Sequence, residues 1–306
     1  MKKVLVIVGP TAVGKTALSL ELAKHYHGEI ISGDSMQIYR QLDIGTAKAT
    51  KEELAAAPHH LIDIREMTEQ YSVAMFQEMA REKIAEITGR GHLPIIVGGT
   101  GLYIQALLYD YRLGAAEEVD DTLRNDYQAQ AEELGKEALW QKLQQIDPAA
   151  AAKIHYNNVR KVIRALEVFE TTGQSIITPK EVPAALYDYF MIGLTTDRGL
   201  LYQRINQRVD QMMDMGLLEE AKNVLRDPDT QAAKGIGYKE FLPYIEGRQS
   251  LEETIEQIKQ NSRRYAKRQL TWFSNRLTPR WVDLVQEPNP QKQIMVEIDQ
   301  WLEEKQ

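Results

Sequence analysis

Residues 4–16 have the sequence VLVIVGPTAVGKT, and this stretch decides the fold. Its first five residues form a short apolar run that is typical of a buried parallel strand. Residues 9–16 match the pattern G-x-x-x-x-G-K-[ST], and residues 15–24 have the apolar spacing of a helix. A strand, this turn and a helix in succession predict a P-loop, in which backbone N–H groups and a helix N-terminus bind phosphate oxygens.

The P-loop predicts the residues that bind a diphosphate or triphosphate. They are Gly9, Thr11, Ala12, Val13, Gly14, Lys15 and Thr16. Lys15 contributes a full positive charge, and the hydroxyl of Thr16 is placed to contact Mg²⁺ directly or through water, so we expect Mg²⁺ as the cofactor. The pattern predicts phosphate binding and does not by itself predict hydrolysis.

Further strands and helices alternate along the chain. We expect strands at residues 29–32, 60–64, 93–97, 189–194 and 281–285, and helices at 71–88 (with Ser72 as N-cap), 200–215, 251–276 and from Pro290 onward. This order predicts an α/β fold with a doubly wound parallel sheet flanked by helices. Residues 115–172 contain only one glycine and one proline and offer no strand. We therefore predict a discontinuous P-loop core domain of residues 1–113 and 189–306, with an all-helical domain inserted at 114–188.

Composition and charge narrow the class of protein. The chain has 306 residues, 43% of them hydrophobic, and no cysteine, which excludes disulfides and cysteine-bound zinc. We find no signal-peptide pattern and no apolar stretch long enough to span a bilayer, so we expect a cytoplasmic monomer without a membrane partner. The net charge is −7, yet residues 259–276 carry six Lys and Arg and no acid, and residues 149–165 also lack acids. Each basic segment is either a contact for a polyanion or a solvated helix face.

Two residues at predicted strand ends are candidates for chemistry. Ligands of open α/β sheets bind at the carboxyl ends of the strands, so Asp34, after the strand at 29–32, is expected near the P-loop. Its carboxylate would accept a proton or orient an amine, and an N-cap or a Mg²⁺ ligand is the alternative. Thr100 follows the strand at 93–97, where many NTPases carry an acid, and would donate a hydrogen bond to a departing oxygen. Tyr265, Trp272 and Phe273 either stack on bases or, as their helical spacing favours, pack in the core.

A set of segments in one order resembles a known family. They are GPTAVGKT (9–16), DSMQIY (34–39), DIGTAK (43–48), VGGTGLY (97–103), RALEVF (164–169), RVDQM (208–212), GLLEE (216–220), GIGYKE (235–240) and AKRQLTWF (266–273). Together they cover nearly the whole chain and resemble the bacterial tRNA dimethylallyltransferases, also called isopentenyl-tRNA transferases. The resemblance implies transfer of the dimethylallyl group from dimethylallyl diphosphate to N6 of the adenosine 3′-adjacent to the anticodon in tRNA, with release of diphosphate.

The resemblance also implies roles for individual residues. Asp34 matches the general base, Thr100 and Arg208 match diphosphate-binding residues, and Arg204, one helical turn before Arg208, is left open as a partner in that role. The implied tRNA-binding residues are Asp34, Ser35, Met36, Gln37, Thr100, Arg124, Arg160, Lys161, Arg164, Lys234, Gly235, Gly237, Tyr238 and Lys239. The target base would leave the anticodon-loop stack to reach the site.

Two other classes of function fit parts of the pattern. A small-molecule kinase would bind ATP in the P-loop and use the helical insert as a lid. A non-catalytic nucleic-acid-binding protein would use the P-loop for regulation.

Overall fold

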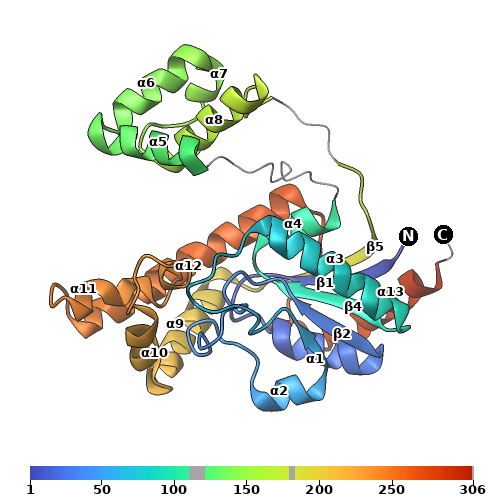
Figure 1. The fold of residues 1–306 in the computed structure, drawn as a ribbon. Coiled ribbons are helices and arrows are strands. Elements are labelled where there is room, and N and C mark those ends of the chain that lie inside the picture. Colours follow the sequence, from blue (N-terminus) through green and yellow to red (C-terminus); the bar gives the residue numbers. More distant parts are fainter. Residues whose placement is uncertain (110–120, 179–182, 305–306) are drawn as a thin grey trace. The chain divides into compact units, whose positions relative to one another are not determined.

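The computed structural model describes residues 1–109, 121–178 and 183–304, and the chain divides into two compact units (Figure 1). One unit comprises residues 1–111 and 184–306, and the other comprises residues 112–183. The helical unit thus ends at residue 183, whereas the sequence placed its end at 188. The backbone N–H of Leu186 donates to the carbonyl of Leu108 at 2.9 Å, which ties this return segment to the first unit.

A six-stranded sheet forms the centre of the first unit, and every strand pair in it is parallel. The strand order is β3-β2-β4-β1-β5-β6. The bounds are β1 (Lys3–Val8), β2 (Gly28–Ser32), β3 (His59–His60), β4 (Leu93–Gly98), β5 (Asp188–Leu194) and β6 (Arg280–Val282). The predicted doubly wound α/β fold is confirmed, and β1 lies between β4 and β5, so the P-loop begins at the centre of the sheet.

Two strand predictions were wrong in extent. The strand expected at 60–64 ends at His60, because Leu61 and Asp63 adopt left-handed backbone conformations with φ of 61° and 55°. The strand expected at 281–285 ends at Val282, because the side chain of Asp283 accepts the backbone N–H of Val285 at 2.8 Å and turns the chain. Neither turn contains the glycine or proline that marks most chain reversals.

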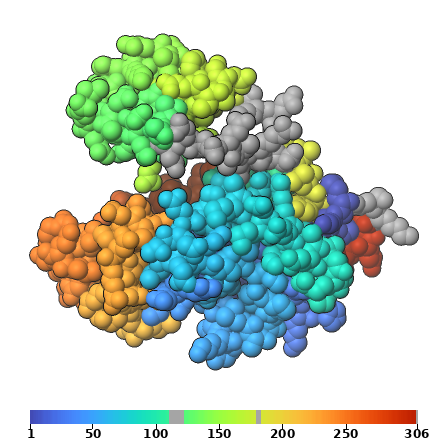
Figure 2. Space-filling model, viewed as in Figure 1, coloured from blue at the N-terminus to red at the C-terminus, as the bar shows by residue number. Residues whose placement is uncertain are grey.

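Helices cover both faces of the sheet, and alternate residues of β1 separate the two cores. Val4, Val6 and Val8 point into one core, and Leu5 and Ile7 point into the other. The first core includes residues of α3 (Val73–Gly89), α4 (Gly101–Leu108), α10 (Leu217–Val224) and α12 (Leu251–Arg276). The second includes residues of α1 (Lys15–His25), α9 (Arg198–Asp214) and α13 (Pro290–Glu303). In Figure 2 the blue-to-teal and the orange-to-red parts of the chain form one continuous surface, as expected of a discontinuous unit.

Local capping fixes where the long helices begin. Ser72 accepts the N–H of Met75 at 3.2 Å, which confirms it as the N-cap of α3. At the start of α12, Ser250 accepts the backbone N–H of Glu253 at 3.2 Å and Glu253 accepts that of Ser250 at 2.9 Å, which forms a capping box. The first unit also contains four short helices: α2 (Lys51–Ala56), η1 (Ala232–Lys234), η2 (Lys239–Phe241) and α11 (Leu242–Ile245).

The second unit is helical throughout its described residues. It consists of α5 (Asp121–Glu133), α6 (Lys136–Ile146), α7 (Pro148–Ala151) and α8 (Val159–Thr172). Tyr127, Leu139, Leu143 and Leu166 are among the buried side chains of its own small core. Across the described part of the chain, no helix has both the length and the apolar character needed to cross a membrane.

A buried carboxylate ties the amino-terminal ends of the sheet together, opposite the P-loop. Glu29 in β2 accepts hydrogen bonds from Arg90 at 3.1 and 2.7 Å and contacts the rings of His60 and His92 at 2.7 Å each. Burial alone would raise the pKa of Glu29, but these hydrogen bonds outweigh it and hold the pKa at about 2. The cluster therefore joins β2, β3 and the turn between α3 and β4.

We predict that Glu29→Gln makes the unfolding free energy less dependent on pH in the acid range. A carboxylate with a lowered pKa stabilises the fold above its ordinary pKa of 4.5, and this contribution is lost as the pH falls toward about 2. At neutral pH the substitution should cost roughly 2 kcal/mol, because a charged hydrogen-bond acceptor is lost. Denaturant unfolding between pH 7 and 3 measures both effects, with the exposed Glu82→Gln as the control. Parallel pH profiles for the variant and the wild type would contradict the prediction.

Candidate active site

The turn between β1 and α1 has the backbone of an anion-binding loop. Ala12 and Gly14 have left-handed conformations, with φ of 67° and 98°, and Gly14 is the N-cap of α1. The first turn of α1 carries no acidic residue, so its free N–H groups and the helix dipole present positive charge. Gly9 must be a glycine, because a Cβ atom there would lie 2.6 Å from the carbonyl oxygen of Leu194.

Lys15 lies across this loop. Its ammonium group donates to the carbonyls of Gly9 at 3.0 Å and Pro10 at 2.5 Å. Burial is the largest cause that lowers the pKa of Lys15 to about 8, and the positive charge of Arg208 is the second. The negative charge of Asp34 offsets part of this effect. A phosphate oxygen would offer Lys15 a stronger acceptor than a carbonyl, because hydrogen bonds between ionised groups are the stronger ones.

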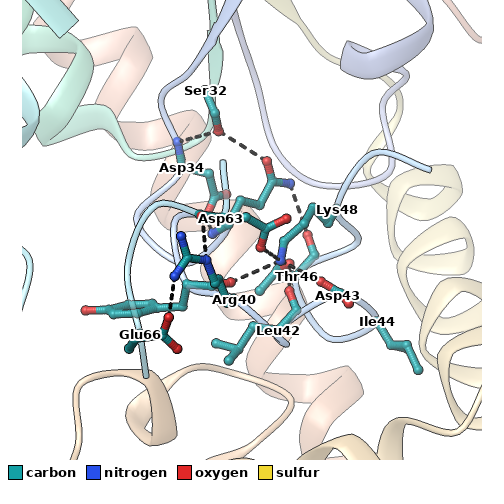
Figure 3. A network of polar contacts seen from close by, with 12 residues as sticks. Ser32, Asp34, Arg40, Leu42, Asp43, Ile44, Thr46, Lys48, Asp63 and Glu66 are labelled. Carbon is teal, nitrogen blue, oxygen red and sulfur yellow. Dashed lines mark hydrogen bonds and ion pairs between the residues drawn. The ribbon is translucent and has the colours of Figure 1, made fainter. Parts of the chain in front are cut away.

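Asp34 follows β2 and faces the same space. Its Oδ1 accepts the backbone N–H groups of Met36 at 2.8 Å and Gln37 at 3.3 Å, which fixes the orientation of the carboxylate. Figure 3 shows Asp34 beside Ser32, whose hydroxyl accepts the N–H of Asp34 at 3.4 Å. Among the described residues, Oδ2 has no hydrogen-bond partner, so this second oxygen is available to a ligand.

Thr100 ends the loop after β4 and contacts the Asp34 loop. Its hydroxyl accepts the backbone N–H of Ser35 at 3.3 Å. Tyr265 of α12 also neighbours Thr100. Burial, followed by the charge of Asp34, raises the pKa of Tyr265 to about 12, and hydrogen bonds with Thr100 and Gln269 offset part of this rise. Gln269 also donates to the carbonyl of Gly99 at 2.9 Å, so α12 holds the end of β4 in place.

Arg204 and Arg208, which the sequence left as possible partners, have different contacts. Arg204 donates through Nε to the carbonyl of Ala12 at 2.8 Å and thereby braces the P-loop. Arg208 lines the cavity. Burial lowers its pKa, and the negative charge of Asp34 offsets part of this shift. Within the described chain its guanidinium has no hydrogen bond or ion pair, so Arg208 is the cation that remains available to a ligand.

Lys15, Asp34, Arg208 and Tyr265 line one cavity of about 310 Å³ in the first unit. The predicted site residue Thr100 is not itself part of this lining and contacts it through Ser35. Its polar lining includes Thr11, Lys15, Thr16, Asp34, Gln37 and Arg208. Its apolar lining includes Ile205, Val209, Met212, Ile236 and Ile258. A cavity with two cations, one carboxylate and a cluster of apolar side chains suits a small ligand that has an anionic group and a short apolar tail.

Most of the predicted tRNA-binding residues of the first unit also line this cavity. Ser35, Met36, Gln37, Gly235, Gly237 and Tyr238 line it together with Asp34. Lys234 and Lys239 are exposed on either side of Gly235–Tyr238. Tyr238 is fully buried, and its hydroxyl donates to Glu220 at 2.8 Å, so its side chain is part of the cavity wall.

The remaining predicted contacts lie in the second unit. Arg160, Lys161 and Arg164 are exposed on α8, and Arg124 is exposed on α5. Arg124 and Arg164 both pair with the buried Glu167 of α8, at 2.7 and 3.2 Å. The pair of Arg124 joins α5 to α8, whereas that of Arg164 lies within α8. Arg160 and Lys161 have no such ion pair within the described residues.

Thr16, for which the sequence predicts contact with Mg²⁺, lines the cavity together with Lys15 and Asp34. Hydroxyl and carboxylate oxygens are ligands that Mg²⁺ accepts. The described part of the chain contains no cluster of three or more His, Asp or Glu side chains arranged as a metal site.

Sequence reasoning missed the part of α12 that lines the site. For Tyr265 the sequence left two alternatives open, stacking on bases and packing in the core. The structure places Tyr265 in the cavity wall next to Thr100. Phe273 is fully buried and belongs to the core, as its helical spacing favoured. The signal for Tyr265 was present, since Tyr265 and Gln269 are four residues apart on one helix face within a segment that carries no acid.

The sheet order, the loop after β1 and the clustered strand ends define an α/β enzyme of the P-loop class. A sequence model of the family described as IPP transferase matches residues 37–276, and the chain belongs to this family. The chain is 64% identical to the tRNA dimethylallyltransferase of Enterococcus faecalis over 100% of this chain and 99% of that protein.

Solved structures agree with the family. The tRNA isopentenylpyrophosphate transferase of Bacillus halodurans is 49% identical, with a TM-score of 0.76 over 99% of this chain and 97% of that chain. A eukaryotic dimethylallyltransferase acting on tRNA is 30% identical, with a TM-score of 0.81 over 100% of this chain and 81% of that chain.

We predict that the affinity for inorganic diphosphate falls as the pH rises above about 8. Lys15 loses its charge in the free protein at that pH, so binding must take up a proton, and the affinity should fall up to about tenfold per pH unit. Lys15→Ala should lower the affinity at pH 7 by about 10–100-fold and remove this part of the pH dependence. Calorimetric titration with diphosphate at pH 7, 8 and 9 measures the affinity of the wild type and of Lys15→Ala. The exposed Lys24→Ala of the same helix is the control. An unchanged pH profile in Lys15→Ala would contradict the assignment.

Proposed function

We propose that the protein transfers the dimethylallyl group of dimethylallyl diphosphate to N6 of the adenosine 3′-adjacent to the anticodon in tRNA and releases diphosphate. The observation that carries the proposal is the convergence of Lys15, Arg208 and Asp34 on one partly apolar cavity in a member of the IPP transferase family, with Thr100 bonded to the lining residue Ser35. The names of the relatives, which refer to tRNA and to this group, support the same substrates.

The donor would bind with its diphosphate on the P-loop. Backbone N–H groups of residues 11–16 and the ammonium group of Lys15 would contact its oxygens from one side, and Arg208 from the other. Thr16 would hold Mg²⁺, which adds positive charge to the leaving group. The allylic tail would lie against the apolar side chains of α9 and α12.

The transfer breaks the C–O bond of the donor and forms a C–N bond to the adenine. The electron pair of the C–O bond leaves with the diphosphate, whose growing charge Lys15 and Arg208 stabilise. The proton of the amine passes to Asp34, whose Oδ1 is fixed by two backbone N–H groups and whose Oδ2 is available to the amine. The amine is a weak nucleophile, because its lone pair is delocalised into the ring, so its orientation by Asp34 and Thr100 matters.

The tRNA would contact both units. In the first unit, Ser35 to Gln37 and residues 234–239 surround the cavity, where a base that has left the anticodon-loop stack would enter. Arg124, Arg160, Lys161 and Arg164 of the second unit, and the basic face of α12, would contact phosphates and position the stem. We place the reaction in the cytoplasm, since the chain carries no cysteine and its substrate is a tRNA.

We predict that label from radiolabelled dimethylallyl diphosphate appears in unmodified tRNA when the protein and Mg²⁺ are present. Asp34→Asn should lower kcat by about 10²–10⁴-fold, as loss of a general base does, and Arg208→Ala by about 10²–10³-fold, as loss of a charge-stabilising donor does. Arg198→Ala, at the exposed start of the same helix, should leave the rate unchanged. Absence of transfer by the wild type would refute the proposal, and ATP turnover would then favour the kinase alternative.

A further inference from the structure

The loop at residues 42–48 is held from outside by a carboxylate of α10. Glu220 accepts three successive backbone N–H groups, from Asp43 at 3.0 Å, Ile44 at 2.9 Å and Gly45 at 2.8 Å. Successive N–H groups that converge in this way form a nest for a negative charge. The charge here is supplied by the protein itself, which fixes the loop on α10.

Tyr238 completes this arrangement from a third segment. Its hydroxyl donates to Glu220 at 2.8 Å, and its ring packs so closely on the loop that a Cβ atom at Gly45 would lie 2.6 Å from it. Burial and the charge of Glu220 raise the pKa of Tyr238, so it remains a donor at neutral pH. A second contact, from Asn223 of α10 to Gln41 at 3.0 Å, holds the start of the loop.

The fixed loop in turn holds Gln37. The side-chain amide of Gln37 donates to the carbonyls of Thr46 at 3.2 Å and Ala47 at 3.4 Å, and its oxygen accepts from Ser32 at 3.2 Å. Figure 3 shows Lys48, at the end of the same loop, beside Asp43 and Asp63, with which it pairs at 2.5 Å each. Gln37 is therefore oriented by a loop whose own position depends on Glu220.

We propose that Glu220 is a positioning residue for tRNA recognition, because its carboxylate fixes the loop that orients Gln37 at the cavity. The inference rests on the proposed function. Glu220 touches neither the P-loop nor Arg208, so its effect falls on the tRNA side of the reaction and leaves the donor side intact.

The test compares Glu220→Ala and Glu220→Gln with Glu219→Gln. Glu219 precedes Glu220 on α10, is exposed, and pairs only with Lys222 among the described residues, so it matches the change of charge without touching the loop. Glu220→Ala should raise the KM for tRNA at least about tenfold, equivalent to about 1.4 kcal/mol, and should change the KM for dimethylallyl diphosphate less than about twofold. Glu220→Gln, which keeps one acceptor oxygen, should restore part of the tRNA affinity.

Two further readouts separate positioning from general damage to the fold. Fluorescence anisotropy with an unmodified anticodon stem-loop RNA measures binding without catalysis and should show the same loss. The preference for the native base next to the target adenosine, measured as a ratio of kcat/KM values, should fall in the Glu220 variants. If Glu220→Ala unfolds at the assay temperature, the KM for tRNA and the RNA affinity are compared between the isosteric Glu220→Gln and Glu219→Gln.

The outcomes are distinct. Transfer by the wild type, with tRNA KM values that do not differ between the Glu220 and Glu219 variants, overturns the role of Glu220 and leaves the proposed function standing. Equal increases in both KM values, or an unchanged preference for the neighbouring base, show a structural role only and also overturn it. A wild type that transfers no label overturns the proposed function and the inference together.

Discussion

The close contact of strand ends is the constraint on which the site depends. Gly9, after β1, approaches Leu194 of β5 so closely that a Cβ atom would lie 2.6 Å from its carbonyl oxygen, and a Cβ at Gly98, in β4, would lie 2.4 Å from the carbonyl of Gly33. Any side chain at these positions would separate the strands. Because the strands meet without side chains, the loops that follow them bring Lys15 and Asp34 to the same cavity, and Thr100 to the Ser35 beside it.

This closeness places two cations and one carboxylate where water is partly excluded. Burial lowers the pKa of both Lys15 and Arg208, and the charge of Arg208 lowers the pKa of Lys15 further, while Asp34 offsets part of each shift. A bound diphosphate would neutralise both cations. The two desolvated positive charges, which are unfavourable in the free protein, would then stabilise the negative charge that develops on a leaving group. Arg204 serves this end indirectly, since its bond to Ala12 holds the P-loop in shape while Arg208 stays available.

Local sequence signals predicted the fold and the loop of residues 9–16 between β1 and α1, and long-range contacts account for what they missed. The P-loop is a contiguous pattern, and Asp34 and Thr100 follow from the rule that strand ends share one edge of the sheet. Gln269 reaches Gly99 across 170 residues, and Glu220 reaches Ile44 across 176, and no local pattern encodes such pairings. The error at residues 60–64 has the same origin, because Leu61 and Asp63 adopt left-handed conformations where the chain bonds to residues 37 and 38, through Asp63 to Gln37 and Ile64 to Ile38. For Arg124 and Arg164, the sequence showed the positive charge but not the buried Glu167 with which both pair.

The end of β4 explains how a P-loop suits group transfer to an amine. In many P-loop NTPases this strand end carries an acid that helps to bind Mg²⁺. Here Thr100 occupies the position and contacts Ser35 and Tyr265, both neutral at pH 7. An acid at residue 100 would add a second negative charge beside Asp34, which would raise the pKa of one carboxyl group and weaken the hold of Lys15 and Arg208 on a diphosphate. With a hydroxyl instead, Asp34 is the one carboxylate in the cavity lining among the described residues, so the proposed mechanism gives proton acceptance and anion binding to separate groups.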